Sequence, residues 1–153
     1  MISFFRYNWQ VRDEWFEWCN HLTPEELVKK RVGGVGGILI TFIHVVDVEF
    51  SWIRAMQGKE DIEPDFSDYD TLEKVKSLSD ANKNEIERFF ETYSSLSDDE
   101  VVAPAWSEEK YTKQEIMHHI IAHEIHHMGQ LSVWAKEMGL KPVSANFIDR
   151  GLG

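Results

Sequence analysis

The sequence predicts an all-α protein built as a four-helix bundle. Three observations lead to this prediction: four segments carry apolar residues at helical spacing, capping residues or glycines mark their ends, and strand-like alternation is nearly absent. Residues 101–103 form one short Val-Val-Ala run that we do not count as a strand. Helices of roughly 18–27 residues joined by loops are typical of a bundle. We expect one domain spanning residues 1–153.

The first helix is expected over residues 3–20. One stripe along it holds Phe5, Trp9, Arg12, Phe16 and Cys19. A short helical turn follows at Thr23, which supplies an N-cap before Pro24. Residues 33–37, Gly-Gly-Val-Gly-Gly, then interrupt the pattern. This run has neither the lysine and hydroxyl of a phosphate-binding loop nor a strand before it, so we interpret it as a flexible entry to the next helix.

The second long helix is expected over residues 35–57, followed by an acidic loop that contains Pro64. Asp70 has the position of an N-cap acid with Glu73 at the third helical residue, and it predicts a third helix that ends near residue 95. The thin apolar stripe of this helix indicates the outer helix of the bundle. Residues 112–115 form a capping box for a fourth helix, which reaches about residue 138.

Composition and charge exclude several classes of partner. The net charge is −11, and the sixteen Lys and Arg never cluster beyond residues 29–31, so we expect no nucleic-acid partner. No apolar run reaches the roughly 18–20 residues of a membrane span, and the first residues lack the layout of a signal peptide. Cys19 is the single cysteine and lies on an apolar stripe, which is typical of a core residue. We expect a cytoplasmic protein without disulfides.

Five of the seven histidines lie between residues 118 and 127. At about 100° per residue, His123 and His127 lie about 40° apart on one helix face, which is the spacing at which two imidazoles reach one metal ion. His119 and Gln130 fall in the same sector, whereas the other two histidines point elsewhere. Apolar residues share this sector, so we expect it to face the bundle core, where a histidine pair must find a partner.

His44 is the third candidate ligand, in the middle of the second long helix among small or apolar neighbours. Three neutral imidazoles from two facing helices provide an open site whose fourth position takes water or substrate. Zinc is the default ion on ligand softness, and nickel or iron(II) also fit. The alternative is that these histidines are core residues bonded to backbone or carboxylates. The opposite face of the same helix is also apolar, which suggests a dimer partner there; it holds Phe42, Val46 and Ile53.

Two other metal motifs are weaker. Residues 123–127 read H-E-x-x-H, the zinc-protease pattern in which Glu124 would be the base. However, Gln130 stands where the extended signature needs glycine, no sheet is expected to hold a peptide, and we place Glu124 outside the bundle interior. A single Glu-x-x-His motif, at residues 115–118, argues against a di-iron oxidase. Asp47 follows His44 by three residues and either orients a ligand, carries a proton or pairs with Arg54.

The motif His123-x-x-x-His127-x-Gly129-Gln130, with a helical histidine far upstream, resembles the DinB/YfiT-like superfamily. Residues 31–36 and 44–52 are similar to one bacterial branch of it. Met128 departs from the pattern, because many relatives have arginine there.

The resemblance implies a bundle of up-down-down-up connectivity, often a homodimer, with zinc or nickel on His44, His123 and His127. Relatives of known activity mostly use low-molecular-weight thiols such as bacillithiol, mycothiol or glutathione. A bound dication lowers the pKa of a coordinated thiol, so the resemblance favours thiol S-transfer to a small electrophile, with metal-dependent hydrolysis second. The alternative is a non-catalytic metal- or ligand-binding stress-response module.

If the chain is an enzyme, three further residues are candidates for orienting a ligand or transferring a proton. These are Asp47, His119 and Gln130. The expected partner is then a small-molecule substrate.

Overall fold

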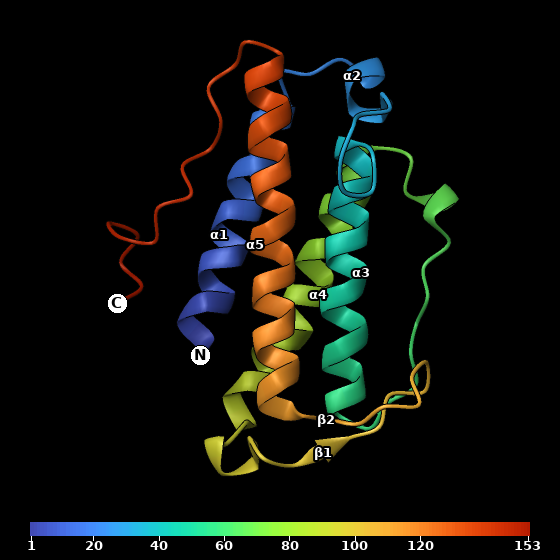
Figure 1. The fold of residues 1–153 in the computed structure, drawn as a ribbon, viewed down its shortest axis with the longest axis vertical. Helices are drawn as coiled ribbons and strands as arrows, with labels where there is room; N and C mark the ends of the chain where they lie inside the picture. The colour runs from blue at the N-terminus through green and yellow to red at the C-terminus, as the bar shows by residue number, and fades with distance from the viewer.

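The computed structural model describes residues 1–153, and most of them are helical (Figure 1). Four long helices form a bundle, and one short helix lies at its end. They are α1 (Ile2–Cys19), α2 (Pro24–Val28), α3 (Ile38–Met56), α4 (Leu72–Thr92) and α5 (Lys113–Glu137). The prediction of an all-α bundle is confirmed. No helix combines the length and apolar character that a bilayer crossing requires.

The long helices run in two directions. In Figure 1, α1 and α5 run upward, whereas α3 and α4 run downward. Because α3 and α4 are parallel, the chain between them must return along the full length of the bundle. It does so along the outside of α3, and it contains the 3-10 turn η1 (Phe66–Asp68). The other two connections between long helices, residues 20–37 and 93–112, each join helix ends at the same end of the bundle.

Two hydrophobic clusters fill the interior, one toward each end of the bundle. The apolar face of α3 that we assigned to a dimer partner belongs to this interior. Phe42 is fully buried and stacks on Phe16 of α1 with 4.5 Å between ring centroids, and Val46 and Ile53 are equally buried. The chain covers this face itself, so the expectation of a homodimer rests on the family resemblance alone.

Local capping sets the helix starts, with two differences from expectation. The Thr112 capping box at the start of α5 is present as predicted. At α4 the N-cap is Thr71 rather than Asp70: the Thr71 hydroxyl accepts from the Lys74 amide, while Asp70 bonds the Lys74 ammonium at 2.7 Å. The second long helix begins at Ile38, three residues later than expected, because residues 33–36 form a loop with positive φ at three glycines.

A two-residue ladder closes the loop before α5. β1 (Val101–Val102) pairs antiparallel with β2 (Tyr111–Thr112). The expectation that residues 101–103 form no strand is wrong at this small scale. Their partner lies about ten residues further along the chain, so the local pattern at residues 101–103 does not show the pairing.

Candidate metal centre

His44, His123 and His127 come together between α3 and α5, and we call them the imidazole cluster. The Nε2 atoms of His44 and His123 are 3.0 Å apart, and those of His123 and His127 are 3.2 Å apart. Each residue offers one nitrogen, and these nitrogens all lie within 4.8 Å of one another. The packing of α3 on α5 thus joins two residues that are 79 positions apart in the chain.

The spacing of these nitrogens fits one metal ion. Nitrogen ligands with bonds of about 2.0–2.1 Å to a tetrahedral zinc ion lie about 3.3–3.4 Å from one another. The two Nε2 separations in the imidazole cluster, 3.0 and 3.2 Å, are close to that value. The cluster includes no thiol and no carboxylate, so an ion held there would keep a position for a ligand from outside the chain.

Burial and mutual repulsion keep two of the rings neutral. Burial, followed by the neighbouring His127 and His44, lowers the pKa of His123 to about 3. Burial and His127 also lower the pKa of His44. Neutral imidazole is the form that ligates a metal. The Nε2 atoms lie against one another, and none of them has the carboxylate or backbone partner that the alternative of ordinary core histidines expects.

Gln130 holds the orientation of His127. Its Oε1 lies 2.9 Å from His127 Nδ1, and its Nε2 lies 3.3 Å from His126 Nε2. An amide oxygen only accepts, so His127 Nδ1 donates and its Nε2 presents a lone pair to the imidazole cluster. Such a bond to the far nitrogen of a ligand is common at metal sites. Gln130 was one of the three residues singled out for an orienting role.

Asp47 lies one turn along α3 from His44 and is half-buried. Burial, and secondarily Asp61, raises its pKa, and the hydrogen bond that it accepts from Ser51 at 3.3 Å opposes the shift. The alternative pairing with Arg54 is wrong, because that guanidinium turns to the Glu60 carbonyl instead.

His119 does not join the imidazole cluster. It is exposed one turn before His123 on α5, with 5.8 Å between the two ring centroids. Its ring packs against Trp52 at 5.5 Å, and Trp52 in turn meets Trp106 at 5.0 Å. His119 therefore belongs to an aromatic wall on one side of the cluster. Neither tryptophan was predicted to lie at the site, since nothing local in the sequence links Trp106, a loop residue, to α3.

Glu124 lies inside the bundle, contrary to our expectation. It is 1% exposed, and Arg12 of α1 donates to both of its oxygens, at 2.7 and 2.6 Å. Arg12 also contacts Glu49 of α3 at 2.9 Å, and we call Arg12, Glu49 and Glu124 the ionic cluster. The helical angle between Glu124 and His123 correctly predicted that Glu124 points away from the imidazole cluster. The side to which it points is covered by α1, so the residue is buried. A carboxylate held by Arg12 is not the base of a zinc protease.

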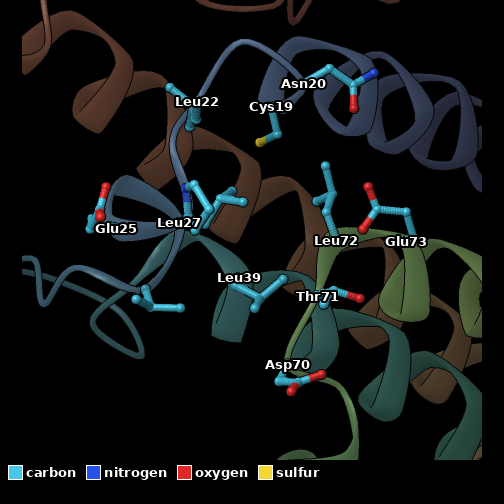
Figure 2. A pocket seen from close by; sticks show the side chains of 12 residues that line it. Cys19, Asn20, Leu22, Glu25, Leu27, Leu39, Asp70, Thr71, Leu72 and Glu73 are labelled. Atoms are coloured by element: carbon cyan, nitrogen blue, oxygen red, sulfur yellow. The ribbon is translucent and has the colours of Figure 1, made fainter.

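A separate hollow of about 420 Å³ lies at the α2 end of the bundle. Figure 2 shows the Cys19 thiol directed toward a space bordered by Leu22, Leu39 and Leu72. Burial raises the pKa of Cys19 to about 12, so its thiol stays protonated at neutral pH. No histidine lines this hollow. Cys19 is thus a core residue, as its apolar stripe indicated.

Comparisons with known proteins agree over almost the whole chain. A family model described as "DinB family" matches residues 1–150. The chain is also 60% identical over 153 residues to the "Uncharacterized protein YizA" of Bacillus subtilis (strain 168). That alignment covers 99% of this chain and 96% of the relative.

Proposed function

This chain belongs to the DinB family, and from that premise we propose that it binds a divalent transition metal through His44, His123 and His127. The observation that carries the proposal is the convergence of three Nε2 atoms, at 3.0 and 3.2 Å, with no other partner. Imidazole donors suit zinc first, and nickel or iron(II) as well.

We further propose that the site serves thiol S-transfer to a small electrophile. A metal bound there would supply the chemistry that lowers the pKa of a thiol and yields thiolate at neutral pH. Within the chain, Gln130 holds His127 in its orientation. Asp47, whose pKa is raised, lies one turn from His44 and is suited to accept or return a proton. His119 and Trp52 border the site toward the start of α5. Metal-dependent hydrolysis is the second reaction class.

The alternative is a metal- or ligand-binding module without catalysis. The hollow at the α2 end has the size of a small-molecule pocket, yet no histidine lines it. A ligand there would not meet the imidazole cluster. Turnover therefore has to be tested separately from metal binding.

Metal binding is tested on protein purified without an affinity tag. We expect stoichiometric metal in the wild type and its loss in H44A, H123A and H127A, because two imidazoles hold an ion far less tightly than three. H118A is the matched control, since His118 is exposed on the same helix and outside the cluster. A wild type that takes up no zinc, nickel or iron(II) in titration would contradict the proposal.

Catalysis is tested by adding bacillithiol or glutathione with a chromogenic electrophile to the metal-loaded chain. We expect saturable turnover that disappears in the H44A/H123A/H127A variant. Metal uptake without turnover for any thiol, or for ester and amide substrates, would leave the metal-binding module as the function.

A further inference from the structure

The glycine-rich loop at residues 33–37 lies against the metal centre. A Cβ added at Gly34 would lie 2.1 Å from Oε1 of Gln130 and 2.6 Å from its Cδ, far inside any non-bonded contact. The φ of Gly34 is also positive, at 51°. A side chain at this position would therefore push the Gln130 amide aside, and the positive φ also favours glycine.

The residue just before the loop is fixed to α5, one turn beyond Gln130. The indole Nε1 of Trp134 donates to the Val32 carbonyl at 3.0 Å, and Trp134 itself is fully buried. Because this anchor is part of the core, the distance between the loop and the Gln130 side chain is set by the packing of the bundle.

Two backbone hydrogen bonds close the loop on itself. The amide of Arg31 donates to the carbonyl of Gly36 at 2.8 Å, and the amide of Gly36 donates to the carbonyl of Gly33 at 3.0 Å. Gly34 lies inside this closed segment. Its backbone is thus positioned from both sides, which suits it to restrain a neighbouring side chain.

We propose that the loop, through Gly34, is a positioning element of the metal centre. It confines the Gln130 side chain so that Oε1 stays on His127 Nδ1 and His127 Nε2 stays directed at His44 and His123. Without the loop, the half-buried Gln130 side chain would be open to solvent on this side and would sample several rotamers. The proposal rests on the proposed function, because the loop acts only through the ligand His127.

The test compares G34A with G33A. Both glycines have positive φ, so both substitutions strain the loop, but a Cβ at Gly33 meets nothing within 4 Å. G34A should weaken Co²⁺ and Zn²⁺ binding by about 10- to 100-fold, the usual effect of losing a partner of a metal ligand, and should change the Co²⁺ absorption spectrum. G33A should leave both unchanged. Thermal unfolding of each variant shows whether the strained loop lowers the stability of G34A and G33A to different extents.

A double-mutant cycle keeps the test decisive when G34A is less stable. Q130A alone should weaken metal binding as much as G34A, and adding G34A to Q130A should produce no further loss. Equal losses in G33A and G34A, or losses that multiply in the double variant, would overturn the proposal.

A readout on metal-free protein separates this proposal from the proposed function. Nitrogen-15 spectra of the His127 ring should show a proton on Nδ1 in the wild type and G33A, and loss of that preference in G34A. An unchanged ring in G34A would overturn the loop proposal even if metal binds. A wild type that binds no metal but shows this difference would contradict only the metal function.

Discussion

The two polar clusters that join α3 and α5 have opposite compositions. The ionic cluster of Arg12, Glu49 and Glu124 is almost wholly excluded from solvent and combines donors with acceptors. The imidazole cluster lies at the border of the bundle, with His44 and His123 half-buried, and presents three nitrogens of one kind. The members of the first cluster bond to one another with opposite charges, whereas the second presents nitrogens that converge on a point.

The difference is the one expected between a structural ion cluster and the metal site that we propose. Buried charges are tolerated when opposite charges and hydrogen bonds compensate for their desolvation, as in the bidentate contact between Arg12 and Glu124. Converging imidazoles with no carboxylate among them stabilise one another only weakly. A single metal ion would contact all three nitrogens. His123 and Glu124 are adjacent in sequence, yet one belongs to each cluster.

Breaking the ionic cluster should have the largest effect. R12L leaves two buried carboxylates unpaired, so we expect a loss of about 3–5 kcal/mol in the free energy of unfolding. Urea unfolding of metal-free protein measures it. The control is the triple variant R12L/E49L/E124L, which removes all three charges and should recover much of the loss. A single variant as stable as the wild type would show that the ionic cluster does not hold the helices.

The imidazole cluster should contribute little to stability without metal and more when metal is bound. In metal-free protein, H44A should change the free energy of unfolding by less than about 1 kcal/mol, because His44 is only half-buried. With zinc at a hundred times its dissociation constant, the wild type should gain about 2.7 kcal/mol and H44A should gain none. Equal stabilisation of both by zinc would place the ion elsewhere.

The pH dependence of unfolding should sharpen the comparison further. His123 in the folded chain has a pKa of about 3, whereas an unfolded histidine titrates near 6.5. Between these values the unfolded chain binds the extra proton, so metal-free protein loses stability as the pH falls from about 6.5 toward about 3. H123A should lose part of this slope. An NMR titration that finds His123 protonated at pH 6 in the folded chain would contradict the assignment.

The smallest effect is expected at Glu49. Its Oε2 accepts from the Trp9 indole at 3.0 Å, but its Oε1 is buried without a partner, and the ionic cluster has two carboxylates for one guanidinium. E49Q removes the surplus charge and keeps the shape, so the free energy of unfolding should change by less than about 1 kcal/mol. A loss comparable to that of R12L would show that the cluster requires both negative charges.

Local physics accounts for the parts of the fold that the sequence predicted well. The Thr112 capping box depends on residues three apart, and it is present as predicted. The same local rule misplaced one N-cap by one residue, because Asp70 and Thr71 are both good caps; in the structure Thr71 caps the helix and Asp70 bonds the Lys74 ammonium. The β1–β2 ladder escaped prediction because the two strands gain order only by pairing with each other.

The helical period alone determined that His123 and His127 share a face and that Glu124 points away from it, because angles along one helix are a local property. Only the tertiary structure decided what lies at each angle. The histidine face belongs to the core as expected, with Ile116, Ile120 and Leu131 buried, although His44 and His123 are only half-buried. Glu124, which we expected to lie outside, meets Arg12, a residue 112 positions away. Such contacts depend on how whole helices pack, and no local pattern encodes which side of α5 another helix will cover.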